Sequence, residues 1–245
     1  MKPHVFIIAE AGVNHNGSLE LAYKLVDAAK EANADCVKFQ TYITENDTAV
    51  NCEKAEYQKT EQQESQYELL KKLELSFDDF RKIQEYCKKK GIMFLSTPFD
   101  IESLKFLEEI HMPIWKIASS EVENFQLLRE MAKTHKPIIL STGMCTIEEI
   151  SNAVDVLKKY GAGEIKILHC NTQYPTPMED VNLKAMYELK SMFQCDIGYS
   201  DHTQGIEVPI AAVAMGATII EKHFTLDRNM EGPDHVASLN PLELK

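Results

Sequence analysis

Several features are missing from this chain of 245 residues, and each absence removes a class of protein. No apolar run approaches the roughly 20 residues that a membrane-spanning helix requires. The N-terminal stretch MKPHVFIIAEAG holds one lysine and only a short apolar run before Glu10, which is too little for a secretory signal. The six cysteines are scattered without a C-x-x-C pair, so we expect reduced thiols in a cytoplasmic protein.

Basic residues are scarce relative to acidic ones, with 26 Lys and Arg against 38 Asp and Glu and a net charge of −12. This excess argues against a nucleic-acid partner and against an anionic membrane, although it leaves room for a locally basic pocket that binds a small anion. The first turn, EAGVNHNGS, lacks the G-x-G-x-x-G fingerprint. An open doubly wound dinucleotide-binding sheet is therefore the less favoured fold.

The chain does contain eight short apolar runs that alternate with helix-like segments. This alternation predicts an α/β fold in which a parallel sheet closes as a single (β/α)8 TIM barrel over residues 1–245. Helices are expected where apolar residues recur at helical spacing after a Ser or Thr, with Gly91 and Gly161 as stops. The strands are expected near residues 5–10, 36–40, 92–97, 114–119, 137–142, 164–170, 196–201 and 218–224, and the clearest helices at 18–32, 76–91 and 146–161.

One connection is much longer than the others, the segment at about 41–75. Loops of this length in compact domains are usually functional or contain a short helix of their own. The segment leaves the carboxyl end of the second strand, so we interpret it as a lid over the barrel mouth. At the other end of the chain, NPLELK resembles the start of a final helix.

The carboxyl ends of the predicted strands all carry polar residues, and the active sites of such barrels lie at these ends. Lysines accompanied by Ser and Thr hydroxyls suit a phosphate or a phosphorylated carboxylate. His202 and His223 follow adjacent strands and could share a divalent cation, with Asp201 and Glu221 nearby. Two hydrogen-bonded structural histidines are an equally good explanation at this point. Strand alternation predicts that Lys222 points outward.

The motifs at these strand ends resemble those of the sialic acid synthase family. They are AEAGVNHNGS, VKFQTY, STPFD, KIASSE, LSTGM, YPTP, GYSDHT, EKHFT and GPDH, in order over nearly the whole chain. The resemblance implies an enzyme that condenses phosphoenolpyruvate with an N-acetylated hexosamine to form a nine-carbon sialic acid and phosphate. It also implies a divalent metal, with Mn²⁺ favoured over Mg²⁺ or another ion, a homodimer and a cytoplasmic location.

The same resemblance implies roles for individual residues. It assigns the metal to His202 and His223, and catalytic roles to Glu121, Glu10 and Glu221. It assigns phosphoenolpyruvate to Lys38, Thr97, Lys116, Ser119, Ser141, Asn171 and Ser200, and the amino sugar to Gln40, Tyr174 and Asp234. Family members usually continue into a C-terminal antifreeze-like domain, which we expect to be absent here because nothing after Lys245 supplies it.

Several alternatives remain open on the sequence alone. N-acetylmannosamine is the first choice of sugar, followed by the precursors of legionaminic acid and pseudaminic acid. A Schiff-base aldolase on the same fold would use Lys116 or Lys38 as its nucleophile and would need no metal. A non-catalytic barrel that binds a sugar is a third possibility, which phosphate release would exclude.

Overall fold

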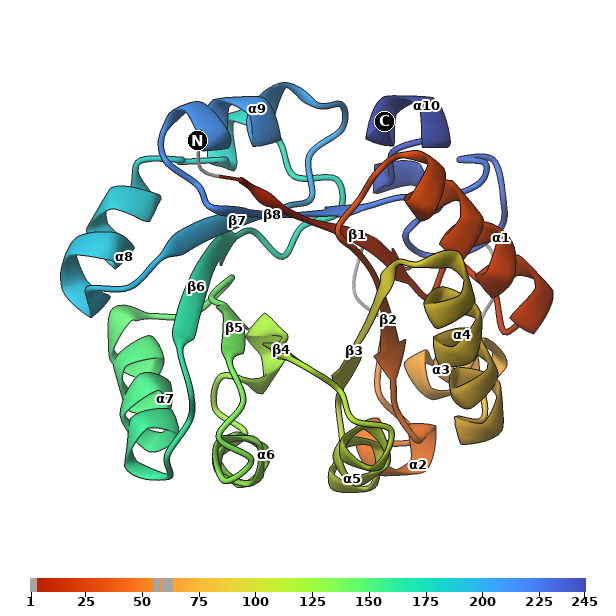
Figure 1. The fold of residues 1–245 in the computed structure, drawn as a ribbon, viewed down its shortest axis with the longest axis horizontal. Helices are drawn as coiled ribbons and strands as arrows, with labels where there is room; N and C mark the ends of the chain where they lie inside the picture. Colours follow the sequence, from red (N-terminus) through yellow and green to blue (C-terminus); the bar gives the residue numbers. More distant parts are fainter. Residues whose placement is uncertain (1–3, 55–57, 59–63) are drawn as a thin grey trace.

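Eight parallel strands form a ring surrounded by helices in the computed structural model, which describes residues 4–54, 58 and 64–245 (Figure 1). The sheet order is β3-β2-β1-β8-β7-β6-β5-β4, and β3 contacts β4 where the ring closes. The strands are β1 Phe6–Gly12, β2 Cys36–Thr41, β3 Met93–Pro98, β4 Trp115–Ile117, β5 Ile138–Ser141, β6 Ile165–Cys170, β7 Ile197–Asp201 and β8 Ile219–His223. The predicted (β/α)8 barrel and each of its eight strands are confirmed.

The outer helices begin and end at the capping residues that the sequence predicted. Ser18, Ser76 and Thr146 each accept a backbone N–H of the first turn of the helix that follows. Gly91 ends its helix in the left-handed conformation, with φ of 68°. The helices are α1 Leu19–Glu31, α2 Thr44–Asp47, α3 Gln66–Leu73, α4 Phe77–Lys90, α5 Ile101–Glu109, α6 Phe125–Ala132, α7 Ile147–Lys159, α8 Ala185–Phe193, α9 Glu207–Ala214 and α10 Pro241–Leu244. Short 3-10 turns lie at η2 Ser119–Glu121, η3 Met178–Asp180 and η4 His235–Ala237.

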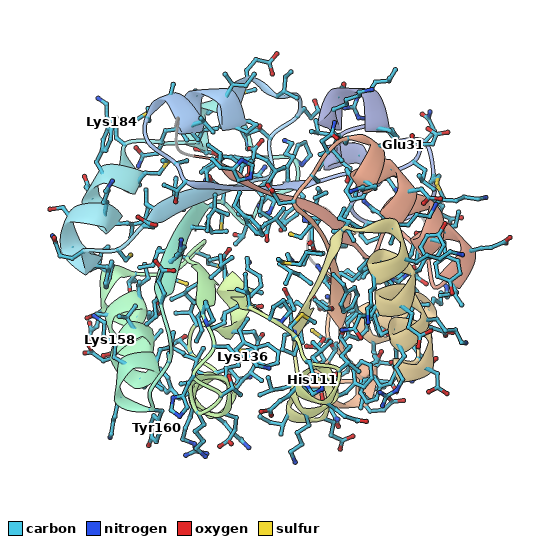
Figure 2. All side chains as sticks on the ribbon, in the orientation of Figure 1. Glu31, His111, Lys136, Lys158, Tyr160 and Lys184 are labelled. Carbon is cyan, nitrogen blue, oxygen red and sulfur yellow. The ribbon has the colours of Figure 1, made fainter. Side chains whose placement is uncertain are left out.

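The hydrophobic core lies mainly between the strands and the helices. Trp115, Phe39 and Phe80 are among its largest fully buried side chains. Side chains on the outer face of the helices reach solvent around the ring, as Lys158 and Lys184 do in Figure 2. Because apolar residues hold the wall from outside, the polar residues of the strands are free to face the interior and the mouth.

The long connection after β2 contains the short helices α2 and α3, which contact each other. Leu73 at the end of α3 packs with Val13 and Tyr42, so α3 is anchored beside the loop that follows β1. Residues 55–57 and 59–63 of the predicted lid lie outside the described residues. Its closing role stays a prediction.

Other expectations about the chain can be checked directly. All six cysteines are free thiols, as predicted. Among the described residues, no helix is long and apolar enough to cross a membrane. The expected final helix is α10, which lies beside α1 (Figure 1).

Candidate active site

Four charged side chains from four strands meet inside the barrel near its carboxyl end. Lys38 Nζ lies 2.7 Å from Glu10 Oε2 and 3.6 Å from Glu221 Oε2, and Lys116 Nζ lies 3.4 Å from Glu221 Oε1. All four side chains are at most 6 % exposed. As predicted, the two lysines converge on one place. Burying four charges is expensive unless they are paired, so their presence together indicates a site built for charged ligands.

The strand register explains how this cluster forms. Glu10 is paired with Lys38 of β2 on one side and with His223 of β8 on the other. Ser200 is paired with Glu221. Side chains at these alternating positions all point to the same face, which is the interior of the barrel. Residues far apart in the sequence therefore reach one small volume.

The pairing controls the ionisation of these groups. Burial alone would raise the pKa of Glu221, but Lys116 and Lys38 outweigh burial and hold that pKa well below its usual range. Burial raises the pKa of Glu10, and Lys38 counteracts only part of the rise. Burial lowers the pKa of Lys116, whereas Glu10 and Glu221 overcome burial at Lys38 and raise its pKa. The cluster thus combines a firmly ionised carboxylate with a carboxyl group that can exchange a proton near neutral pH.

Two predicted phosphoenolpyruvate residues contact the charged cluster directly. Lys38 Nζ donates to Thr97 Oγ1 at 3.2 Å, and Ser200 Oγ donates to Glu221 Oε1 at 2.9 Å. Both hydroxyls are buried. The lysines and these hydroxyls together form a set of donors that an anionic substrate could share.

The remaining predicted phosphoenolpyruvate residues lie on β5, directly after β6 and in the turn after β4. Ser119 Oγ accepts the Gly143 N–H at 2.8 Å. Ser141 Oγ is buried and has no hydrogen-bond partner among the described residues, which leaves it available to a ligand. Asn171 donates through its side chain to the Asp180 carbonyl at 2.9 Å, while its Oδ1 is buried without a described partner.

His202 and His223 lie side by side, with ring centroids 5.5 Å apart. Burial lowers the pKa of His202 to about 4 and the pKa of His223 well below its ordinary value. Both rings are therefore neutral at neutral pH, which is the form that binds a metal. The Asn171 carbonyl accepts a hydrogen bond from His202 Nδ1, so Nε2 carries the lone pair.

The hydrogen bonding of the ring nitrogens is compatible with a divalent cation between the two histidines. His223 Nδ1 is buried and has no hydrogen-bond partner among the described residues. His202 Nε2 accepts a hydrogen bond from the Tyr174 hydroxyl at 2.9 Å, which a cation at that nitrogen would replace. No group of three or more His, Cys, Asp or Glu in the described part of the chain could enclose a metal. A cation held by two imidazoles would keep positions open for substrate.

The predicted sugar residues lie on β2 and in the segments that follow β6 and β8. Tyr174 stacks on His202, with ring centroids 4.0 Å apart. Gln40 is paired with Thr97 of β3 and is half-buried. Asp234 is 7 % exposed, and burial raises its pKa to about 6. Glu121, the predicted acid/base, accepts a hydrogen bond from Asn124 at 2.8 Å, and burial raises its pKa.

One part of the sequence interpretation was wrong. Asp201 was expected to support the metal, but its carboxylate lies on the outer side of the wall, 2.5 Å from Lys222 Nζ. Lys222 does point away from the interior, as alternation predicts, yet it is only 2 % exposed. The pairing of Lys222 with Asp201 was not predicted from the sequence. Its signal was the shared position of the two residues, each directly before one of the two histidines.

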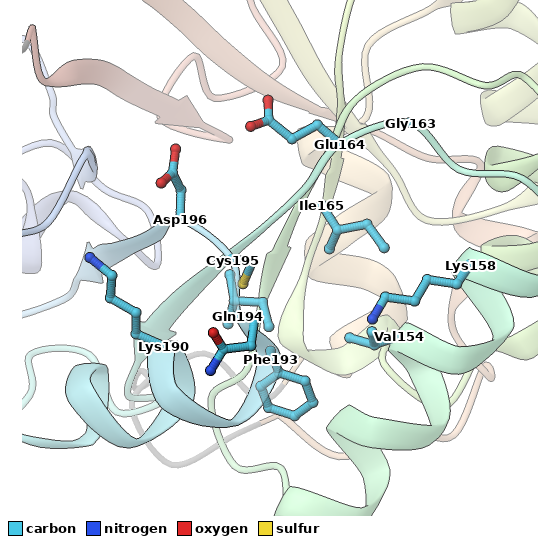
Figure 3. A pocket seen from close by; sticks show the side chains of 11 residues that line it. Val154, Lys158, Gly163, Glu164, Ile165, Lys190, Phe193, Gln194, Cys195 and Asp196 are labelled. Atoms are coloured by element: carbon cyan, nitrogen blue, oxygen red, sulfur yellow. The ribbon is translucent and has the colours of Figure 1, made fainter.

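A large groove lies elsewhere, between α7 and α8, with a volume of about 680 Å³. Figure 3 shows Lys158 of α7 and Lys190 of α8 on either side of it, with Cys195 and Phe193 between them. Its lining includes Ile165 and Asp196 at the amino ends of β6 and β7. None of the predicted site residues lines this groove, so size alone does not locate the site.

A (β/α)8 barrel with buried charged side chains and two histidines at the carboxyl ends of its strands has the architecture of a barrel enzyme. The chain belongs to the NeuB family, whose model matches residues 25–245. An N,N'-diacetyllegionaminic acid synthase of Campylobacter jejuni is 53 % identical over 98 % of this chain and 73 % of its own length. Its namesake from Legionella pneumophila is 51 % identical over 98 % and 69 %.

The structure and more distant relatives agree with this assignment. The crystal structure of an N-acetylneuraminic acid synthetase from Leptospira borgpetersenii, in complex with citrate, superimposes with a TM-score of 0.88 at 42 % identity. It covers 98 % of this chain and 80 % of the other. A pseudaminic acid synthase of C. jejuni is 39 % identical and a human N-acetylneuraminate-9-phosphate synthase 37 % identical, each over 98 % of this chain. The predicted family resemblance is confirmed.

Proposed function

We propose that this barrel condenses phosphoenolpyruvate with an N-acylated amino sugar and water, and releases a nine-carbon sialic acid and phosphate. The observation that carries the proposal is the convergence of Lys38 and Lys116 on Glu221, beside His202 and His223. Family membership gives this cluster its chemical meaning. We also propose that the enzyme works as a cytoplasmic homodimer, as the family resemblance implies.

The protein groups would act mainly by electrostatics and proton transfer. Lys38 and Lys116 would bind the phosphate and carboxylate of phosphoenolpyruvate and offset their charge in a largely dry pocket. Carbon 3 of phosphoenolpyruvate attacks the aldehyde carbon of the open-chain sugar. Water adds to the oxocarbenium ion left at carbon 2, and the resulting intermediate expels phosphate by cleavage of the C–O bond.

Proton transfers accompany these steps. Burial raises the pKa of Glu121 and raises the pKa of Glu10 to about 7, so Glu10 can hold a proton near neutral pH. We assign Glu121 as the acid/base that exchanges a proton with the sugar oxygen or with water. Glu221, whose pKa is held low by the lysines, would instead stay ionised beside the histidines.

The proposed cofactor is a divalent metal, most simply Mn²⁺. His202 and His223 would hold it, because both are neutral and His223 Nδ1 has no partner among the described residues. When bound, such an ion withdraws electron density from the sugar carbonyl carbon and makes it a better electrophile. Gln40, Tyr174 and Asp234 would orient the sugar beside it.

The sugar itself is the finer part of the proposal. N-acetylmannosamine was the first choice from the sequence, and it fits the family. The relatives at 53 % and 51 % identity are named for N,N'-diacetyllegionaminic acid, whereas the N-acetylneuraminate-9-phosphate synthase is 37 % identical. These identities favour a diacetamido sugar over N-acetylmannosamine as the preferred substrate.

A panel assay tests both levels of the proposal. Phosphate release from phosphoenolpyruvate would be measured with Mn²⁺ and each candidate amino sugar, with and without a chelator. We expect release only with an N-acylated amino sugar, fastest with the diacetamido sugar, and loss of activity on chelation. No phosphate release with any sugar of the panel would contradict the synthase, and a strong preference for N-acetylmannosamine would overturn only the choice of sugar.

The buried Lys116 supports one competing function. Its pKa is lowered by burial, a property that activates lysine for Schiff-base formation. A Schiff-base aldolase would be inactivated by borohydride in the presence of a keto acid, with a covalent adduct on Lys116, and would resist chelators. The synthase predicts no adduct and full chelator sensitivity.

A further inference from the structure

The outer face of the wall carries an ion pair between β7 and β8, the two strands that lead to the histidines. Lys222 Nζ of β8 lies 2.5 Å from Asp201 Oδ2 of β7. The two side chains are 3 % and 0 % exposed. None of the roles assigned above to the interior of the barrel involves this pair.

The pair connects more than two side chains. Lys222 Nζ also donates to the carbonyl of Thr203, and Asp201 Oδ1 accepts the N–H of Thr203 at 3.0 Å and its hydroxyl at 2.8 Å. Asp201 and Thr203 are the residues on either side of His202. Lys222 is the residue directly before His223. One ammonium group therefore binds both neighbours of one histidine and is itself the neighbour of the other.

The position of this network in the ladder gives it a specific task. The backbone pairing of β7 with β8 ends at Asp201 and Lys222, so His202 lies just beyond the last paired rung. His223 is still held by its pairing with Glu10 of β1. The segment around His202 is tied to β8 by the side chain of Lys222 rather than by the ladder.

A contribution to fold stability alone does not readily explain why this buried ion pair is present. Removing two charges from water costs several kcal/mol per ion, and apolar side chains of similar volume often stabilise a protein as well or better. An ion pair with defined hydrogen bonds does, however, fix distance and orientation more narrowly than apolar packing. Precise spacing matters here because the described residues contain no group of three or more His, Cys, Asp or Glu that could hold a cation, so each of the two imidazoles would count.

We propose that Lys222 and Asp201 are positioning residues that set the separation and orientation of His202 and His223 for metal binding. This inference rests on the metal part of the proposed function. Groups outside the first set of ligands that orient them usually change metal affinity roughly 10- to 100-fold when they are removed.

Direct measurement of Mn²⁺ binding tests this role without relying on turnover. The full chain would be compared with Lys222→Met, which keeps the length of the side chain but removes its charge and donors. Asp201→Asn is a second variant, since it keeps an acceptor for Thr203 and weakens the tie to Lys222. Thr134→Val is the matched control, because it removes a part-buried 2.7 Å hydrogen bond to Trp115 at the opposite end of the barrel.

We expect titration calorimetry or electron paramagnetic resonance to show Mn²⁺ affinity lowered roughly 10- to 100-fold in Lys222→Met and in Asp201→Asn. Thr134→Val should bind Mn²⁺ normally even though it is less stable, and phosphoenolpyruvate affinity without metal should be unchanged in all three. Normal Mn²⁺ affinity in a folded Lys222→Met or Asp201→Asn would overturn the inference alone. No Mn²⁺ binding by the unaltered chain would overturn the inference together with the proposed metal.

Discussion

The two ends of this barrel handle charge in opposite ways. At the carboxyl ends of the strands, Lys38 and Lys116 are almost fully buried and contact buried carboxylates. At the amino ends, Lys166 pairs with Asp196 at 3.2 Å, but the two side chains are 28 % and 48 % exposed. Water screens the second pair and not the first. The charges at the mouth are buried and have to be offset by neighbouring groups, and such a cluster is typical of a functional site.

Substitution of a histidine at the mouth should give the largest difference in activity between variants at the two ends. His223→Ala removes a proposed ligand, so we expect metal-dependent turnover to fall by more than the roughly 100-fold that loss of an outer partner can cost. The circular dichroism spectrum should stay native. Lys190→Ala, in the groove between α7 and α8, is the control at the other end. Retained activity with unchanged metal dependence in His223→Ala would remove that residue from the site.

The buried lysine should matter more for stability than the exposed one. Lys38→Met leaves Glu10 and Glu221 with one fewer cation, so the free energy of unfolding should fall by roughly 3–5 kcal/mol. Lys166→Met should lower it by less than about 1 kcal/mol. Urea denaturation of both variants measures the contrast. Equal losses of unfolding free energy in the two variants would show that burial does not make the ion pairs at the mouth more important for stability.

Asp234 should make stability depend on pH at the mouth. Burial raises its pKa from 3.8 to about 6, so the folded chain holds this proton more tightly than the unfolded chain. The carboxylate therefore destabilises the fold increasingly as pH rises from about 4 to 6, and fully above 6. Asp234→Asn should stabilise the protein at pH 7, by roughly 3 kcal/mol, with little gain near pH 4.

The same variant should lose activity while it gains stability, because Asp234 is a proposed sugar ligand. Thermal unfolding from pH 4 to pH 8, together with the KM for the sugar, measures both effects. Asp196→Asn, an exposed carboxylate at the amino ends, is the control. A gain in stability that is the same at every pH would refute the assignment of the shift to Asp234.

The groove between α7 and α8 should give the smallest effect. Lys190→Ala changes the lining of this groove, yet we expect kcat and both KM values to stay unchanged. Steady-state kinetics with both substrates provides the measurement. A marked fall in kcat would mean that the amino ends of the strands take part in the reaction.

The sequence predicted the fold because every strand and several helices carry local signals. The β-branched run before Glu221 and the Ser and Thr caps need no tertiary context to be recognised. The inward face of each strand follows from alternation, so the meeting of Lys38, Lys116 and Glu221 was also predictable. The outward direction of the Lys222 side chain was predictable in the same way.

Tertiary context decided what the sequence could not. A side chain that points outward from the barrel need not be exposed, because helices cover the outer wall. Lys222 is buried there against Asp201. The hydrogen bond from Tyr174 to His202 depends on how the loop after β6 folds back over β7. Neither feature has a local pattern, so each required the positions of at least two distant segments.

The central claim is that the charged mouth cleaves the C–O bond of phosphoenolpyruvate while joining it to an amino sugar. Phosphoenolpyruvate labelled with ¹⁸O at the bridging oxygen tests this most directly, with mass spectrometry of the products after reaction with Mn²⁺ and the preferred sugar. The account predicts that the label leaves in the phosphate and that product forms in equal amount. Label retained in the sugar acid or in pyruvate would show cleavage of the P–O bond and would contradict it.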